Sequence, residues 1–156
     1  MSVGLSRKAI ILWKSIKILK NWPVFVKLYF HKINSEYVVL ETRKGIKIKL
    51  RVDSTDLMAF TNVWLVEEYQ KTDSCIKYED VVIDIGAHIG LFALYASQFC
   101  KAGKIFCFEP IKENFDVMTS NIELNRISNV YSTNAAVSVD NNIVTIYLNE
   151  IGRAHV

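Results

Sequence analysis

Short apolar runs alternate with longer amphipathic stretches through the second half of this chain. The runs cover residues 81–85, 104–108 and 130–137, and the stretches between them, 90–101 and 111–125, place apolar residues at helical spacing. Strands that alternate with helices in this way predict an α/β fold, in which crossover helices join the strands of a parallel sheet. Because the first run is apolar at almost every position, we expect a central strand buried on both faces.

The middle of the chain predicts a β-hairpin followed by a helix. Residues 37–42 and 46–52 flank the turn at Lys44-Gly45, and the second arm alternates strictly between apolar and basic side chains. One face of the hairpin should therefore be buried, while its basic face is either solvated or in contact with an anionic substrate. Residues 53–55 offer a side-chain cap for a helix from about 55 to 71.

Turn-forming residues predict the ends of the later elements. Gly103 is suited to end the helix over 90–101, and Asn125 is suited to end the next helix in the left-handed conformation. A turn is expected at residues 140–142, and alternating apolar residues over 143–148 predict a fourth strand.

The first 32 residues are basic and rich in aromatic side chains. They hold seven Lys and Arg residues and no acid, so the rest of the chain carries a net charge of −4. Apolar residues share one helical face that Lys20 interrupts, which leaves the amphipathic pattern imperfect. Two interpretations stay open, a helix that covers the domain or a peripheral contact of residues 1–32 with an anionic membrane surface. We divide the chain into a basic helical segment, 1–35, and a domain over 36–156.

Charge and cysteine content narrow the class of protein. Residues 33–156 lack the basic surface of a nucleic-acid-binding domain, so we expect no nucleic-acid partner. Cys75, Cys100 and Cys107 form no C-x-x-C pair, which predicts no metal site, no disulfide framework and a reducing, cytoplasmic setting. No stretch reaches the ~18 apolar residues of a membrane-spanning helix.

The most specific chemical motif lies where the first apolar run ends. Asp84, Gly86 and Gly90 form a D-x-G-x-x-x-G pattern, and Glu109 ends the second apolar run. Acids and glycines at the ends of neighbouring parallel strands are typical of a nucleotide-type cofactor cleft. A dinucleotide fingerprint needs G-x-G-x-x-G, and His88 occupies the place of its second glycine. The pattern therefore favours S-adenosylmethionine (SAM) over NAD.

Each residue of this motif has a physical reason to be there. Gly86 permits a positive φ and close approach of a ligand, and Gly90 lets the next helix pack tightly on the sheet. Asp84 can accept a hydrogen bond from the ammonium group of the cofactor, and Glu109 can accept from both ribose hydroxyls. His88 titrates near neutrality, but its place in the turn favours a turn residue beside the cofactor over a general base.

Four segments, VVIDIGAHIGLF, FCFEPIKENF, NIELN and NAAVS, follow RVDSTD at residues 51–56 in this order. The ordered set resembles the FkbM family of SAM-dependent methyltransferases over about residues 36–156. The resemblance implies a Rossmann-like class I methyltransferase sheet and O-methylation of a sugar or another small polar acceptor, such as a glycan. The residues that it assigns to SAM are Asp84, Gly86, Ala87, His88 and Gly90 at the methionine end, Glu109 at the ribose, and Pro110, Asn134 and Ala135 near the adenine.

The same resemblance implies an incomplete sheet. Family members continue into a D-x-E-G-x-E motif that this chain does not contain, so we expect the N-terminal part of a methyltransferase domain, inactive on its own. The strand over 81–85 would then present an unpaired apolar edge that promotes self-association. Two alternatives stay open, a catalytically inactive SAM- or nucleotide-binding fragment or partner subunit, and an NAD-linked oxidoreductase, which His88 argues against.

Several further residues have two interpretations. Glu68 and Tyr69 either border the methionine side of the cofactor or belong to the core helix. Asn121 and Asn125 are expected to cap and end helices rather than to act chemically. Cys107 lies inside a predicted strand and should be inert.

Overall fold

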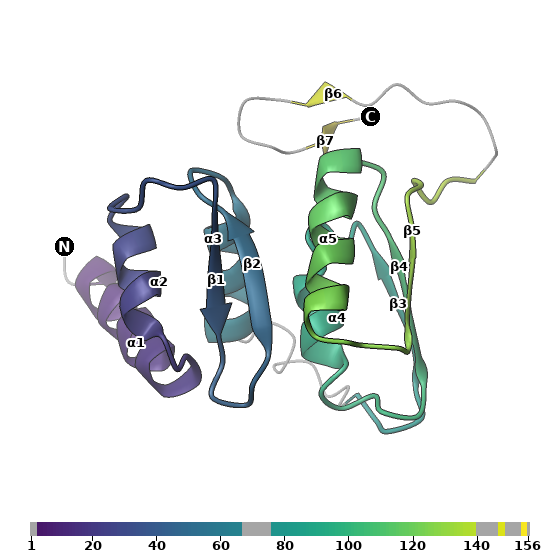
Figure 1. Ribbon diagram of the computed structural model, residues 1–156, viewed down its shortest axis with the longest axis horizontal. Coiled ribbons are helices and arrows are strands. Elements are labelled where there is room, and N and C mark those ends of the chain that lie inside the picture. The colour runs from purple at the N-terminus through teal and green to yellow at the C-terminus, as the bar shows by residue number, and fades with distance from the viewer. Residues whose placement is uncertain (1–2, 67–75, 140–146, 149–153, 156) are drawn as a thin grey trace.

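The computed structural model describes residues 3–66, 76–139, 147–148 and 154–155 (Figure 1). The first half holds α1 (Val3–Ile18), α2 (Trp22–Tyr29), β1 (Tyr37–Glu41), β2 (Lys47–Arg51), α3 (Asp56–Phe60) and the π-helix η1 (Thr61–Leu65). The second half holds β3 (Val81–Ile85), α4 (Leu91–Ala96), β4 (Lys104–Phe108), α5 (Lys112–Leu124), β5 (Val130–Thr133), β6 (Tyr147–Leu148) and β7 (Ala154–His155). In this described part, no helix is both long and apolar enough to cross a membrane.

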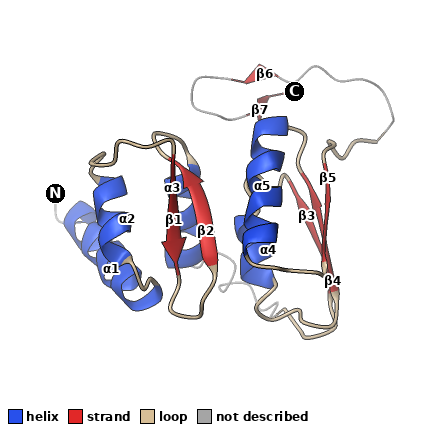
Figure 2. Cartoon of the chain, viewed as in Figure 1, coloured by secondary structure: helices blue, strands red, loops and turns tan. Residues whose placement is uncertain are grey.

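These elements stack in alternating layers of helix and strand (Figure 2). Helices α1 and α2 form one outer layer, the β1–β2 hairpin with α3 comes next, and α4 and α5 separate it from the sheet (Figure 1). Strands β1 and β2 are antiparallel, whereas β3, β4 and β5 form a parallel sheet in that order. The predicted α/β fold, with its preceding helices and hairpin, is confirmed.

One apolar core joins the N-terminal helices to α4 and α5. Its buried members include Leu19, Phe25, Leu28, Leu40, Ile48, Leu50, Phe60, Trp64, Leu65, Ile89, Leu94 and Val117. The alternation predicted in the second arm of the hairpin is confirmed, because Ile48 and Leu50 are fully buried. Since α1 and α2 share this core with α4, the N-terminal helices pack on the rest of the protein. The division at residue 35 stays a prediction.

A second core fills the space between the parallel sheet and its two helices, and no described element covers the other face of the sheet. Its buried residues are Ala87, Ala93, Ala96, Cys100, Ile105, Cys107, Met118 and Ile122. On the opposite face Val81, Ile83 and Ile85 are 65%, 62% and 63% exposed. The sheet grows in one direction, so right-handed crossovers place both helices on the same face.

The expectation that β3 is a central strand buried on both faces is therefore wrong for the described residues. Among the described strands, β3 pairs only with β4 and forms the edge of its sheet. Its apolar outward face was read from the sequence as a sign of burial, but no described element covers it.

Several predicted elements are shorter or differently wound than expected. The helix predicted from about 55 to 71 is α3 followed by the π-helix η1, and residues 67–71 lie outside the described part. The N-cap residue of α3 is Thr55, whose side chain makes no cap hydrogen bond. Ser54, one residue earlier, accepts the Asp56 N–H at 3.1 Å. The helix predicted over 90–101 ends at Ala96, and the strand predicted over 130–137 ends at Thr133.

The last predicted elements are tested only in part. Asn125 has φ −100°, so it is not the left-handed stop that we expected, and Arg126 at φ 53° takes that role instead. The turn expected at 140–142 lies outside the described residues. Of the strand predicted over 143–148, only β6 is described, and it pairs antiparallel with β7.

Asparagine side chains form hydrogen bonds with the backbone along both edges of the hairpin. Asn21 donates to the Val39 carbonyl and accepts the Glu41 N–H, at 2.9 and 2.8 Å, along the outer edge of β1. On the edge of β2, Asn121 accepts the Lys49 N–H at 2.7 Å and donates to the carbonyls of Lys49 and Ile89.

Asn125, one helical turn after Asn121, closes the same edge further along. It accepts the Lys47 N–H at 2.8 Å and donates to the Lys47 carbonyl. The prediction that Asn121 serves as a helix cap is wrong, because its amide binds the backbone of β2. For Asn125 the prediction is confirmed, because it is the C-cap residue of α5 and its amide also donates to the Asn121 carbonyl at 2.8 Å. An unpaired strand edge tends to recruit other chains, and these amides satisfy it.

We expect the chain to self-associate through the open face of the sheet, because three apolar side chains of β3 line it. Ile83→Lys should shift the protein toward monomer, and sedimentation velocity over a range of concentrations measures this. Val39→Lys is the matched control, since Val39 is a 42% exposed apolar residue on a strand of the hairpin. If both variants weaken the association to the same extent, or if neither weakens it, the sheet face is not the contact.

Candidate functional site

The candidate site lies where β3 ends and the chain turns into α4. Gly86, His88 and Gly90 all adopt left-handed backbone angles, with φ 76°, 52° and 79°. The N–H groups of Gly86 and Ala87 donate to the Phe108 carbonyl at 2.9 and 3.0 Å, which ties the turn to the end of β4. The carboxyl ends of two neighbouring parallel strands therefore meet here, as predicted.

The two glycines of this turn face different surroundings. A Cβ added at Gly86 would meet nothing within 4 Å, whereas one at Gly90 would lie 2.8 Å from Cγ of Met118. Open space therefore lies beside Gly86, where a ligand can approach the backbone closely. The tight packing expected at Gly90 is present, but its partner is helix α5 rather than the sheet.

Glu109 holds the turn from the end of β4. The residue is only 4% exposed, and its two carboxylate oxygens accept the His88 N–H at 2.7 Å and the Ile111 N–H at 2.9 Å. Asn114 donates a longer hydrogen bond to the same carboxylate at 3.4 Å. Glu109 thus organises the backbone of the turn after β3 and of the loop after β4. Its contact with a ribose stays a prediction.

Asp84 differs from Glu109 in having a carboxylate oxygen with no partner. Its Oδ2 is buried and makes no hydrogen bond to any described residue. Burial, together with the negative charge of Glu109, raises the pKa of Asp84 from 3.8 to about 6. A buried acceptor without a donor costs free energy, so this oxygen is suited to a donor that no described residue supplies.

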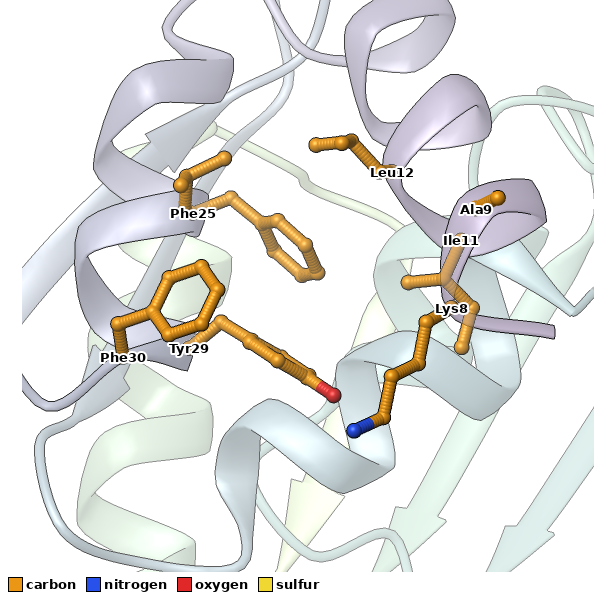
Figure 3. Close-up of a pocket in the computed structure, with 8 residues that line it drawn as sticks. Lys8, Ala9, Ile11, Leu12, Phe25, Tyr29 and Phe30 are labelled. Carbon is orange, nitrogen blue, oxygen red and sulfur yellow. The ribbon is translucent and has the colours of Figure 1, made fainter. Parts of the chain in front are cut away.

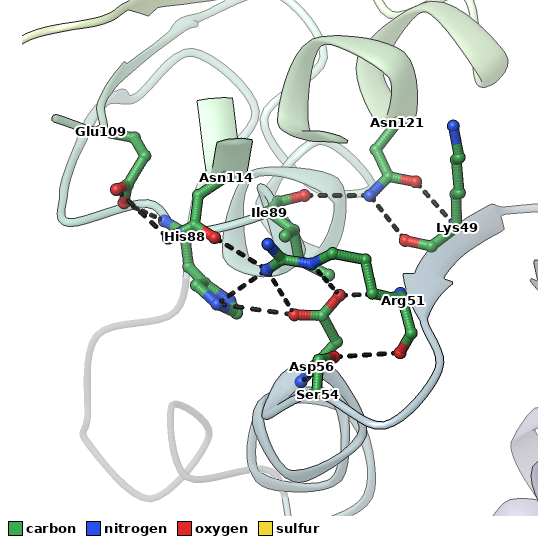
Figure 4. Close-up of polar contacts among 9 residues, drawn as sticks. All are labelled: Lys49, Arg51, Ser54, Asp56, His88, Ile89, Glu109, Asn114 and Asn121. Carbon is green, nitrogen blue, oxygen red and sulfur yellow. Dashed lines mark hydrogen bonds and ion pairs between the residues drawn. The ribbon is translucent and has the colours of Figure 1, made fainter. Parts of the chain in front are cut away.

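A polar network lies beneath the turn and links four elements (Figure 4). Arg51 of β2 donates to both oxygens of the fully buried Asp56, at 3.0 and 2.8 Å, and to Oδ1 of Asn114 at 2.7 Å. The Arg51 N–H also donates to Asp56, at 2.8 Å. The network reaches Glu109 through Asn114, and it therefore connects the hairpin to the turn.

The imidazole of His88 points toward this network (Figure 4). Its Nε2 lies 3.6 Å from Oδ1 of Asp56 and 3.5 Å from a guanidinium nitrogen of Arg51. Burial lowers the pKa of His88, with Arg51 acting in the same direction and the carboxylates of Asp56 and Glu109 opposing it. Burial therefore favours the neutral imidazole, and Glu109 accepts a hydrogen bond from the backbone N–H of His88. Its Nδ1 is buried without a partner in the described part.

Two of the residues predicted near the adenine, Asn134 and Ala135, follow β5, and the third, Pro110, follows β4. Asn134 donates to the carbonyls of Glu109 and Pro110, at 2.7 and 3.1 Å, and the Ala135 N–H donates to the Thr133 carbonyl. Asn134 thus joins the end of β5 to the loop that follows Glu109. Cys107 is buried in β4, and burial raises its pKa to about 12, which agrees with an inert thiol. Glu68 and Tyr69 lie outside the described residues.

Sequence reasoning missed the network residues Arg51, Asp56 and Asn114. Arg51 was assigned to a solvated or substrate-facing side of the hairpin, but it bridges Asp56 and Asn114. Asp56 appeared only within the RVDSTD segment. The sequence does hint at this pair, because Asp56 stands at the start of a predicted helix, five residues after Arg51. This spacing does not distinguish a buried ion pair from one at the surface.

Comparison with known proteins decides the family. Residues 39–155 match the TRM5/TYW2 methyltransferase domain. The chain belongs to this family. TRM5/TYW2 membership confirms a SAM-dependent methyltransferase domain and SAM as its cofactor. The resemblance to FkbM proteins is confirmed only at this coarser level, since the matching family is TRM5/TYW2.

Two individual proteins illustrate the relationship. Methyltransferase sdnD from Sordaria araneosa is 37% identical over 59 residues, which cover 35% of this chain and 23% of that protein. The crystal structure of M. jannaschii TYW2 in complex with AdoMet superposes with a TM-score of 0.52 and 21% identity, over 64% of this chain and 43% of that one. The TYW2 structure supports the class I fold. This chain spans less than half of either protein.

The residues of this TRM5/TYW2 domain fit SAM at the turn. Gly86 leaves open space beside the backbone, and the unpartnered Oδ2 of Asp84 can accept from the ammonium group. Pro110, Asn134 and Ala135 lie beyond Glu109, where the adenine is expected. The predicted absence of a metal stays a prediction; no described group of three or more His, Cys, Asp or Glu residues is arranged to hold a metal ion.

We expect Asp84 to make the stability of the TRM5/TYW2 domain depend on pH. Because its folded pKa of about 6 lies above the ordinary 3.8, the folded protein binds this proton more tightly than the unfolded chain. Stability should therefore fall as the pH rises from about 4 through about 6. Asp84→Asn should raise the free energy of unfolding at pH 7.5 by up to about 3 kcal/mol, and should have little effect at pH 4.

Urea denaturation at the two pH values measures this difference. Asp116→Asn is the control, because the Asp116 side chain is 57% exposed in its pair with Lys112. An Asp84→Asn variant that is equally stabilised at both pH values would show that burial of the charge is not the cause.

Proposed function

We propose that this chain binds SAM at the Gly86 turn and takes part in methyl transfer to an oxygen of a sugar or another small polar acceptor. Two observations at the carboxyl end of β3 carry the proposal, the open space beside Gly86 and the Oδ2 of Asp84 that has no partner among the described residues. Ligands of open α/β sheets bind outside the carboxyl ends of the strands. Membership of the TRM5/TYW2 methyltransferase family supports methyl transfer as the reaction at this site.

In this proposal each residue of the cleft has a binding or positioning role. Asp84 accepts from the ammonium group, and the charge of that group favours the ionised carboxylate. Glu109 keeps the His88 and Ile111 N–H groups in place and offers its outer edge to the ribose. SAM supplies an activated methyl group on its sulfonium. The protein's share is to hold the acceptor oxygen within ~3–3.5 Å of that methyl, a proximity effect.

A second candidate acceptor is RNA, which the tRNA-modifying TRM5/TYW2 family suggests. The charge distribution opposes it for residues 33–156, which carry a net −4, and favours it only for the basic N-terminal helices. Incubation with labelled SAM and either tRNA or a panel of sugars separates the two candidates. SAM binding without transfer to either would support the catalytically inactive fragment. The cytoplasmic setting belongs to this proposal too, and rests on the cysteine pattern alone.

Two glycine variants test the site itself. Gly86→Ala and Gly45→Ala both place a side chain at a positive φ, 76° and 87°, and in both the new Cβ meets nothing within 4 Å. We therefore expect similar losses of stability, about 1–2 kcal/mol, from the backbone alone. Only Gly86→Ala should weaken SAM binding, by about tenfold or more, since its Cβ occupies the space of the ligand.

Isothermal titration calorimetry with SAM, and with NAD as the competing cofactor, measures the two affinities. Equal SAM affinity in Gly86→Ala and Gly45→Ala would contradict the placement of SAM at this turn. Tighter binding of NAD than of SAM by the unmodified chain would favour the oxidoreductase alternative.

A further inference from the structure

Helices α1 and α2 enclose an apolar groove of about 450 Å³ on the side of the molecule away from the parallel sheet (Figures 1 and 3). Its size falls within the ~300–1,000 Å³ of small-molecule sites. The side chains of Leu12, Tyr29 and Phe30 line it and are 42%, 37% and 60% exposed. A folded protein seldom leaves aromatic and aliphatic side chains together in solvent without a partner for them.

Polar groups gather at one end of this groove. Among the described residues that line it, the only charged group is the Lys8 ammonium, and Figure 3 shows it at the same end as the hydroxyl of Tyr29. The rest of the lining consists of hydrocarbon and ring carbon from both helices. A groove of this kind suits an amphiphile with an apolar tail and a polar head that accepts hydrogen bonds.

The apolar surface continues from the groove around α1. Ile10, Trp13 and Ile16 are 54%, 59% and 37% exposed, and Ile16 lies one helical turn beyond Leu12. The ammonium of Lys17 lies 5.7 Å from the centre of the Trp13 ring. Exposed tryptophan beside lysine is typical of helices that lie in a membrane interface.

The positive charge of residues 1–32 favours a negatively charged partner. Residues 1–32 hold seven Lys and Arg residues and no Asp or Glu. Lys20 pairs with Glu41 of the hairpin at 3.0 Å, but Arg7, Lys8, Lys27 and Lys32 form no ion pair with any described residue. Basic side chains near an anionic bilayer each contribute about 1 kcal/mol of attraction.

We propose that α1 and α2 form a docking site for an anionic phospholipid membrane, with an acyl chain in the groove and a lipid phosphate near Lys8 and Tyr29. The membrane is favoured over RNA because the exposed surface is largely aliphatic at Ile10, Leu12 and Ile16. Single-stranded nucleic acids are bound by polar, basic grooves with aromatic stacking platforms. The site is remote from the Gly86 turn, so it does not depend on SAM binding.

Vesicle flotation of the full chain tests the proposal. We use phosphatidylcholine vesicles with and without phosphatidylglycerol, at low and high salt, and add tRNA or dihexanoyl-phosphatidylglycerol as competitors. The Leu12→Ser/Phe30→Ser variant removes apolar surface of the groove. Tyr78→Ser, at a 62% exposed residue outside the N-terminal helices, is its matched control. Lys8→Gln tests the head-group end, with Lys101→Gln, exposed after α4, as control.

The unmodified chain and both controls should float with the anionic vesicles and not with the neutral ones. Binding should weaken at least tenfold in Leu12→Ser/Phe30→Ser and severalfold in Lys8→Gln. Circular dichroism checks that each variant is folded. Binding that responds to the lysine but not to the groove variant would overturn the acyl-chain site.

Three other results would also overturn the proposal. The first is the absence of flotation at low salt, and the second is displacement by tRNA with loss of tRNA binding in the groove variant, which would assign the surface to RNA. The third is a change only in the oligomeric state of the groove variant, which would assign the groove to a second copy of the chain.

Discussion

Replacement of Asp56 by alanine should lower the free energy of unfolding by about 3–5 kcal/mol, because it leaves the Arg51 guanidinium without a negatively charged partner. Asp56 is fully buried and accepts three hydrogen bonds from Arg51, one of them from the backbone. Arginine stays protonated at pH 7 without any partner, so this guanidinium cannot escape the cost by losing its proton. Equilibrium unfolding in urea at pH 7 measures the loss.

The matched control is Asp116→Ala. Asp116 also pairs with a basic residue, Lys112, but the two side chains are 57% and 65% exposed. Exposed pairs contribute ~0–1 kcal/mol, so this variant should be nearly as stable as the parent. A double variant, Arg51→Met/Asp56→Leu, should recover much of the loss, since apolar residues can replace a buried ion pair. Similar stabilities of Asp56→Ala and Asp116→Ala would contradict the network as a structural link.

Glu109→Ala should weaken SAM binding by about 2–3 kcal/mol, which corresponds to about 30- to 150-fold. The variant loses the acceptor of the His88 and Ile111 N–H groups, so the turn loses its fixed shape along with its carboxylate. Glu123→Ala, at an exposed position near the end of α5, is the control and should bind SAM as the parent does. Calorimetry measures both affinities.

Two further measurements separate the roles of Glu109. If it holds the turn, amide hydrogen exchange at His88 should become faster in the ligand-free variant, since its N–H loses a 2.7 Å hydrogen bond. If it also contacts the ribose, the parent should discriminate against a 2′-deoxy analogue of SAM, and the variant should not. Unchanged SAM affinity in a folded Glu109→Ala protein would contradict both roles.

The pattern of apolar runs was sufficient to predict the parallel sheet, the hairpin and the glycine turn. Strand and helix periods are local properties of the chain, and so are the positive φ values that Gly86 and Gly90 adopt. The family resemblance extended these local patterns to a SAM-dependent methyltransferase domain. It did not identify the family, because TRM5/TYW2 and FkbM proteins were not distinguished by the motifs of the turn.

The partners of each polar side chain depended on contacts between distant parts of the chain. Asn121 resembles a helix cap in the sequence, but the approach of α5 to β2 gives its amide a strand edge to bind. Arg51 resembles a solvated residue, but α3 brings Asp56 against it and α5 brings Asn114. Hydrogen bonds across 63 to 78 positions carry no local pattern by which sequence periodicity could find them.

The burial of β3 likewise depends partly on the sequence and partly on the tertiary structure. The apolar side chains of Val81, Ile83 and Ile85 predict that this strand favours an apolar environment. They do not predict which elements cover it. Chain direction decides that question, because the sheet extends from β3 through β4 to β5 and right-handed crossovers place α4 and α5 on one face. The sequence therefore determines which residues of β3 are hydrophobic, whereas the packing of α4 and α5 determines which face of the sheet is buried.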